Sequence, residues 1–170
     1  MKLLVVVDMQ NDFISGALGS SEAEKIVPYV KGLVESFDGQ VIFTRDTHYE
    51  NYMETQEGKN LPVPHCVFGT EGWQIHPDLE VLRKTEAVNK ITFGSKELVE
   101  LLKDRTDIEN ITFVGLCTDI CVISNVMLIK AYYPEIPLMV DAKGCAGVKP
   151  QSHKTALDAM KAIQVKIVNE

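Results

Sequence analysis

The sequence contains no apolar run of the length that a membrane span or a secretory signal requires. After Met1 and Lys2, only the five apolar residues Leu3–Val7 precede Asp8. A transmembrane helix needs about 20 such residues, and the core of a signal peptide needs about 7 to 15. We therefore expect no membrane partner and a cytoplasmic location.

Clusters of basic residues are also absent. The 17 Lys and Arg residues are scattered along the chain and are outnumbered by 24 Asp and Glu residues, which gives a formal net charge of -7. Because such a surface repels phosphate backbones, we expect no nucleic-acid partner. Cysteines are few, and the four present are Cys66, Cys117, Cys121 and Cys145. In a reducing compartment such cysteines are buried, reactive or metal-bound more often than disulfide-paired.

The remaining composition is that of an ordinary globular chain. It has 170 residues, 45% of them hydrophobic and 24% charged. This length suits one domain with a sizeable core, and the sequence shows no internal repeat and no linker. We expect a single domain over residues 1–170.

Strand-like apolar runs alternate with helical patterns along the whole chain. Strands are expected at Leu3–Asp8, Val41–Thr44, Glu86–Lys90, Ile111–Gly115, Pro137–Val140 and Val165–Val168. Helices are expected at Glu22–Phe37 after Ser20 or Ser21, from Ser95 to about Lys103, at Asp119–Tyr132 and at Pro150–Ile163. This alternation predicts a three-layer α/β fold with a mainly parallel sheet and right-handed crossovers. The segment from Arg45 to Arg83 is irregular, and loops of that length are usually functional.

Polar residues stand where several of these strands end. Asp8 closes the first strand, Asp46 follows the second, Lys90 ends the third, and Gly115–Asp119 follows the fourth. In open parallel sheets the ligand site lies beyond the carboxyl ends of the strands. The sequence therefore predicts that these side chains meet at one edge.

Cys121 is the candidate nucleophile. Thr118 and Asp119 are good N-cap residues, which would put Cys121 in the first turn of the following helix. There the helix dipole would lower the thiol pKa from about 8.5, and backbone N–H groups could hold an oxyanion. The alternative is that Cys121 is a core residue of an apolar helix, since free Cys is often buried. Cys117 and Cys145 are interpreted as packing residues.

A thiol nucleophile also needs a proton acceptor and a nearby cation. Asp8 could be the acceptor, because partial desolvation at the end of an apolar strand raises a carboxyl pKa. Lys90 could stabilise the thiolate. The alternatives are a loop-fixing carboxylate for Asp8 and a solvated side chain for Lys90.

Two motifs extend these assignments. They are Asp8-Met9-Gln10-Asn11-Asp12-Phe13 and Gly115-Leu116-Cys117-Thr118-Asp119-Ile120-Cys121-Val122. With Lys90 between them, the chain resembles the isochorismatase-like cysteine hydrolases over essentially its whole length. The resemblance implies a doubly wound six-stranded sheet of order 3-2-1-4-5-6 and a catalytic triad of Asp8, Lys90 and Cys121. It also implies a cis peptide before Cys117, which would aim the N–H groups of Cys117 and Cys121 at the oxyanion.

A metal site is predicted beside the triad. In an extended Asp46-Thr47-His48 both outer side chains lie on one side of the chain, and His65 supplies a third donor. Glu57 is a plausible fourth ligand, and the thiol of Cys66 is a second choice. Such a set of nitrogen and oxygen donors suits Zn, Mn or Fe. The alternative is ordinary hydrogen bonding within a loop.

The metal residues resemble those of one subgroup, the nicotinamidases. The matching segments are Asp46-Thr47-His48 and Pro64-His65-Cys66-Val67-Phe68-Gly69-Thr70. The resemblance implies an ion that holds the pyridine nitrogen of nicotinamide while the cysteine attacks the carboxamide. Phe13 matches the aromatic residue that packs on the substrate ring, although it could instead be a core aromatic. A homodimer or larger homo-oligomer is also implied.

The leading hypothesis is therefore an amidohydrolase that converts nicotinamide to nicotinate and ammonia. A second hypothesis is a metal-independent hydrolase of another small amide, carbamoyl or vinyl-ether substrate. A third is a binding module that keeps the fold without the chemistry. Intact candidates for all three catalytic roles argue against the third.

Overall fold

The fold is a doubly wound α/β sheet. The computed structural model describes residues 1–170. Its elements are β1 (Lys2–Val7), α1 (Asn11–Ile14), α2 (Ser21–Ser36), β2 (Gln40–Asp46), η1 (Tyr52–Glu54), α3 (Gln56–Asn60), α4 (Pro77–Glu80), β3 (Val88–Lys90), α5 (Lys96–Leu102), β4 (Asn110–Leu116), η2 (Thr118–Val122), α6 (Ile123–Tyr132), β5 (Leu138–Ala146), α7 (Pro150–Ala162) and β6 (Lys166–Val168). The six strands are parallel and lie in the order β3-β2-β1-β4-β5-β6. This topology confirms the predicted fold class.

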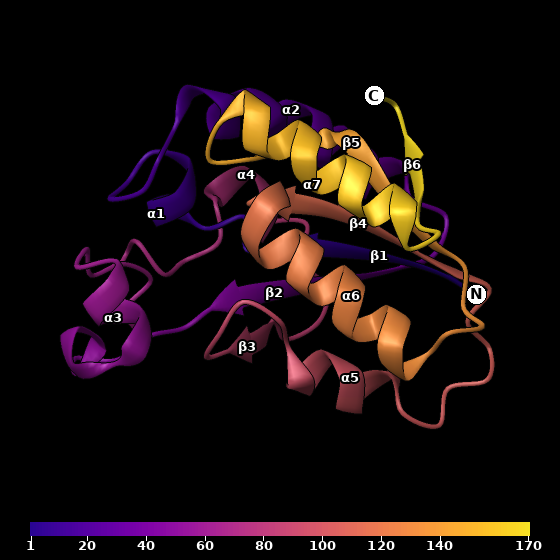
Figure 1. The fold of residues 1–170 in the computed structure, drawn as a ribbon, viewed down its shortest axis with the longest axis horizontal. Coiled ribbons are helices and arrows are strands. Elements are labelled where there is room, and N and C mark those ends of the chain that lie inside the picture. The colour runs from indigo at the N-terminus through magenta and orange to yellow at the C-terminus, as the bar shows by residue number, and fades with distance from the viewer.

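Both faces of the sheet are buried. Successive side chains of a strand point to opposite faces, so each inner strand contributes to two apolar clusters. In β1, Leu3, Val5 and Val7 join one apolar cluster with side chains of α5, α6 and α7. Leu4 and Val6 join a second cluster with side chains of α1, α2 and α4. Figure 1 shows α5, α6 and α7 in front of the sheet and α2 behind it. No helix combines the length and the apolar character needed to cross a lipid bilayer.

Most predicted elements lie within a few residues of their expected positions. Ser20 caps α2 by accepting a hydrogen bond from the N–H of Ala23 at 3.1 Å, and Ser95 caps α5 in the same way. Two strands are longer than predicted: β2 continues to Asp46, and β5 continues from Val140 to Ala146. The irregular segment contains η1, α3 and α4, and α1 was not expected from the sequence pattern.

The close approach of β1 and β4 depends on a glycine at the end of β4. Gly115 is paired with Val7 and has a φ of +118°. A Cβ atom at this position would lie 2.1 Å from the carbonyl oxygen of Val7, closer than any side chain can approach. Only glycine fits both the conformation and the space. It places the chain leading to Cys121 beside the end of β1, where Asp8 lies.

Candidate active site

The side chains of Asp8, Lys90 and Cys121 converge at the carboxyl edge of the sheet. The ammonium nitrogen of Lys90 lies 2.6 Å from Oδ2 of Asp8 and 3.5 Å from Sγ of Cys121. Asp8 and Lys90 are completely buried, and Cys121 is 4% exposed. The three residues that the sequence selected for one site therefore meet in the structure, in a dry environment that strengthens their electrostatic interactions.

Asp8 is held by a residue that the sequence analysis did not select. Thr44 of β2 donates its hydroxyl hydrogen to Oδ1 of Asp8 at 2.6 Å and accepts the N–H of Asp8 at 3.2 Å. Burial raises the pKa of the Asp8 carboxyl above its ordinary value, while the charge of Lys90 and the Thr44 hydrogen bond act in the opposite direction. A carboxylate with a raised pKa is a better proton acceptor than an exposed one.

Lys90 keeps its positive charge although it is buried. Burial alone would lower the pKa of its ammonium group, but the negative charges of Asp8 and Asp46 and the hydrogen bond to Asp8 outweigh burial and raise this pKa. The ammonium also donates a hydrogen bond to the carbonyl oxygen of Thr92 at 3.0 Å. Lys90 is therefore a fixed cation between a carboxylate and a thiol.

Cys121 lies in a helical turn, but its surroundings differ from the prediction in two respects. The N-cap of the turn is Cys117, not Thr118 or Asp119, and η2 is a π-helical turn that leads into α6. Burial raises the pKa of the Cys121 thiol, and Lys90 offsets this only in part. The expected lowering of this pKa is therefore wrong, because desolvation of the buried thiol outweighs the favourable charge of Lys90. The peptide bond between Leu116 and Cys117 is cis, as the family resemblance implies.

A second cluster, formed by Asp46, His48, Glu57 and His65, adjoins the triad. One donor atom of each residue lies within 4.8 Å of those of the others. Nε2 of His48 is 2.9 Å from Oδ2 of Asp46 and 3.5 Å from Oε1 of Glu57. Nε2 of His65 is 3.6 Å from each of the same two oxygens. The structure thus brings together all four of the residues predicted as metal ligands, while Cys66 is not a member of this cluster.

The chemistry of this donor set fits a divalent metal ion. Two carboxylates match the charge of the ion, and two imidazoles supply the nitrogen ligands that zinc and similar metals prefer. Nδ1 of His65 lies 2.8 Å from the carbonyl oxygen of Val63, which assigns the hydrogen to Nδ1 and leaves Nε2 free as a donor toward the cluster. Burial alone would raise the pKa of Asp46. When no ion is bound and the imidazoles of His48 and His65 carry a hydrogen on Nε2, their hydrogen bonds to the carboxylate and the charge of Lys90 hold this pKa below its ordinary value.

Gln10 is a further residue of the site that the sequence analysis did not assign. It is completely buried, and its amide accepts the N–H of Asp46 at 2.8 Å. The amide also donates to the carbonyl oxygens of Asp46 at 2.8 Å and Trp73 at 2.9 Å. Gln10 therefore fixes the backbone that carries one member of the metal cluster. Its place in the Asp8–Phe13 motif was the available signal.

Aromatic rings surround the metal cluster. The ring of Phe13, the predicted substrate-packing residue, lies 5.4 Å from that of His65 and is 8% exposed. Tyr52, which the sequence analysis missed, stands 4.7 Å from the ring of His48 and 5.2 Å from that of His65. These contacts limit the rotation of the two imidazoles and make the surroundings of the cluster apolar.

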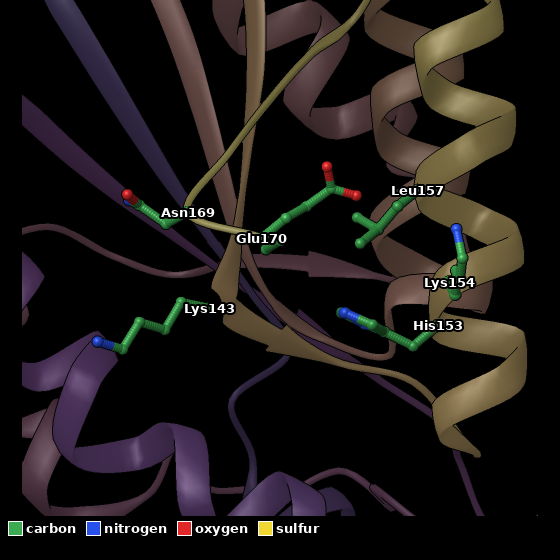
Figure 2. Close-up of a pocket in the computed structure, with 7 residues that line it drawn as sticks. Lys143, His153, Lys154, Leu157, Asn169 and Glu170 are labelled. Carbon is green, nitrogen blue, oxygen red and sulfur yellow. The ribbon is translucent and has the colours of Figure 1, made fainter.

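A separate pocket of about 620 Å³ lies away from this site, between β5, α7 and the C-terminal residues. Figure 2 shows that the side chain of His153 points into it, with Lys154 and Leu157 on the same helix. Nδ1 of His153 lies 2.7 Å from the hydroxyl oxygen of Thr118, so this pocket is linked to the turn that carries Cys121. None of the predicted site residues lines it.

The sequence matches one known protein family over almost its whole length. The family model described as the isochorismatase domain matches residues 2–169. The chain belongs to the isochorismatase family. Within this family it is similar to the nicotinamidase/pyrazinamidase of Mycobacterium tuberculosis, with 27% identity over 99% of this chain and 98% of the relative.

Solved structures of relatives agree with this subgroup. The nicotinamidase/pyrazinamidase of Bacillus subtilis superposes with a TM-score of 0.88 at 25% identity, covering 99% of both chains. A pyrazinamidase of Pyrococcus horikoshii, solved in complex with zinc, gives a TM-score of 0.82 at 28% identity and the same coverage. Within the isochorismatase family, the chain thus resembles proteins named as nicotinamidases and pyrazinamidases. The Pyrococcus horikoshii relative was solved with zinc, and in this chain Asp46, His48, Glu57 and His65 form a cluster that could hold a metal ion.

Proposed function

We propose that this protein hydrolyses nicotinamide to nicotinate and ammonia, with Cys121 as the nucleophile. The position of Lys90, 2.6 Å from a carboxylate oxygen of Asp8 and 3.5 Å from the sulfur of Cys121, is the observation that carries the proposal. The similarity to nicotinamidases over almost the whole chain supports the choice of substrate.

The first half of the reaction forms a thioester. Asp8 accepts the proton of the Cys121 thiol, and the resulting thiolate attacks the carboxamide carbon. Lys90 stabilises the thiolate until the attack, because its charge favours the ionised sulfur. The backbone N–H groups of Cys117 and Cys121 stabilise the tetrahedral oxyanion. The C–N bond then breaks, and Asp8 returns the proton to the departing nitrogen, which leaves as ammonia.

The second half of the reaction releases the acid. A water molecule attacks the thioester carbon while Asp8 accepts one of its protons. The C–S bond breaks, nicotinate is released, and the Cys121 sulfur regains its proton. Asp8 therefore acts as base and acid alternately, and its raised pKa makes it a better proton acceptor than an exposed carboxylate.

Orientation of the substrate is assigned to the metal cluster and to Phe13. Asp46, His48, Glu57 and His65 would hold a zinc, manganese or iron ion, which when bound supplies a Lewis-acidic partner for the pyridine nitrogen. Phe13 would pack against one face of the ring. Fixing the ring in this way keeps the carboxamide near the nucleophile, and proximity of this kind supplies a large share of the rate.

Ammonia release from nicotinamide tests the proposal. We expect turnover by the metal-loaded protein, loss of turnover in Cys121→Ala, and loss on chelation that added metal reverses. Cys145→Ala is the matched control, because this buried cysteine of β5 lies outside the site. No turnover by metal-loaded wild-type protein would exclude nicotinamide as the substrate. Turnover of another small amide after complete chelation would instead favour a metal-independent hydrolase.

A further inference from the structure

Asn125 is a completely buried amide in an otherwise apolar part of α6. Its buried neighbours on the helix are Val122, Val126 and Ile129. An amide in such surroundings destabilises the fold unless each of its polar atoms has a hydrogen-bond partner. The partners of Asn125 therefore indicate what the residue does.

Three of the four hydrogen-bonding positions of this amide are used, including both N–H donors. Oδ1 accepts the N–H of Ser95 at 2.9 Å. Nδ2 donates to the carbonyl oxygen of Phe93 at 3.0 Å and to that of Cys121 at 2.8 Å. The reversed orientation of the amide would place an oxygen against two carbonyl oxygens and a hydrogen against an N–H group, so the partners fix the orientation.

These bonds join the two segments that hold the reacting groups. One partner is the carbonyl of Cys121 itself, one helical turn earlier. The others belong to the connection between β3 and α5, which lies beside α6 in Figure 1. The same connection contains Thr92, whose carbonyl oxygen accepts the Lys90 ammonium at 3.0 Å. Asn125 thus contacts the nucleophile's turn on one side and the segment that orients Lys90 on the other.

We propose that Asn125 is a positioning residue that fixes the Cys121 sulfur relative to the Lys90 ammonium, an inference that rests on the proposed role of Cys121. The distance between these two groups, 3.5 Å, depends on two segments from different parts of the chain. No other side chain bonds both to the backbone of Cys121 and to the Phe93–Ser95 segment. Loss of the amide lets the two segments move apart while substrate contacts remain.

The test compares two replacements of similar size. Asn125→Leu removes all three hydrogen bonds, and Asn125→Asp keeps the acceptor for Ser95 but places an oxygen against the carbonyls of Phe93 and Cys121. For both, we expect kcat for nicotinamide to fall about tenfold to a hundredfold while KM changes less than about twofold. We also expect slower alkylation of Cys121 by iodoacetamide, measured by mass spectrometry, with the alkylation of Cys145 unchanged.

Val126→Ala is the matched control, because Val126 is the adjacent, completely buried residue of the same helix. This variant should unfold at a lower urea concentration than the wild type, and its kcat should stay within about twofold of the wild-type value. If Asn125→Leu does not fold, Asn125→Thr carries the test. Its hydroxyl can bond the Cys121 carbonyl but is too short for the Phe93–Ser95 segment, so we expect a folded protein with reduced kcat.

Two results separate this inference from the proposed function. A wild-type protein that does not hydrolyse nicotinamide contradicts the proposed function, and the alkylation rates of Cys121 then still test the role of Asn125. A folded Asn125 variant whose Cys121 alkylation rate stays within about twofold of wild type overturns the positioning role. Wild-type kcat in such a variant overturns it equally.

Discussion

The ammonium nitrogen of Lys90 lies 3.4 Å from Oδ1 of Asp46, and the two residues are direct partners in the register of β2 and β3. The other carboxylate oxygen of Asp46 is 2.9 Å from Nε2 of His48. Asp46 therefore touches both the triad and the metal cluster. The two halves of the site are connected through this one carboxylate, so a change in one half affects the other.

Replacement of Asp46 should impair the enzyme more severely than replacement of His65. Both Asp46→Asn and His65→Ala are expected to reduce bound metal and to lower kcat/KM for nicotinamide by more than about a hundredfold, since each removes a ligand. Excess metal should restore part of the activity of His65→Ala only, because Asp46→Asn also removes a charge partner of Lys90. Metal analysis and ammonia assays measure both effects. His76→Ala is the control, and equal recovery of the two variants would contradict the shared role of Asp46.

Loss of the Thr44 hydroxyl should shift the pH dependence of the reaction. The Thr44 hydrogen bond stabilises the ionised form of Asp8 and lowers the pKa of this carboxyl. In Thr44→Val the pKa of Asp8 rises, so a higher pH is needed to ionise the base, and the acidic limb of the kcat/KM profile should move to higher pH.

The same variant should be less stable by about 1–3 kcal/mol, because a buried carboxylate oxygen loses its donor. Thr112→Val should leave the profile unchanged, because this buried threonine of β4 pairs with Leu4, four residues before Asp8. An unshifted or downward-shifted acidic limb in Thr44→Val would show that Asp8 is not the group that titrates in this limb.

Gly115→Ala should lower the stability of the protein, whereas Gly32→Ala should raise it. At Gly115 the new Cβ would meet the Val7 carbonyl oxygen at 2.1 Å, in a backbone with a φ of +118°. The backbone conformation alone costs about 1–3 kcal/mol, so Gly115→Ala should unfold at a clearly lower urea concentration. Gly32 lies within α2 and its Cβ would meet nothing within 4 Å, so Gly32→Ala should gain about 0.5–1 kcal/mol. Equal unfolding midpoints would contradict the close β1–β4 approach.

The sequence predicted the fold because its periodicities are strong. The apolar run before Asp8 and the alternation of strands with helices were sufficient for the three-layer α/β class, whereas the strand order 3-2-1-4-5-6 was implied by the family resemblance. The prediction ended β5 too early, because Asp141 and Lys143 interrupt its apolar pattern although Asp141 is buried. Tyr29 and Asn169 bond the Asp141 carboxylate, and such tertiary partners cannot be seen in a local pattern.

The sequence predicted the main residues of the candidate site but not the residues that support them. Asp8, Lys90 and Cys121 stand at strand and helix ends, where position alone suggests a role. Thr44 and Asn125 act through partners 36 and 30 residues away in the chain, and no spacing rule reveals such pairs. The pKa of Cys121 was predicted in the wrong direction, because the degree of burial is a property of the folded structure.

Trapping of the covalent intermediate tests the central claim most directly. Acid quenching during nicotinamide turnover, followed by peptide mass spectrometry, should reveal a nicotinoyl thioester on Cys121. The thioester should be absent from Cys121→Ala, and it should form far more slowly in Asp8→Asn and Lys90→Met. Turnover by Cys121→Ala, or an acyl group on Cys66, Cys117 or Cys145 instead, would contradict the assignment of Cys121 as the nucleophile.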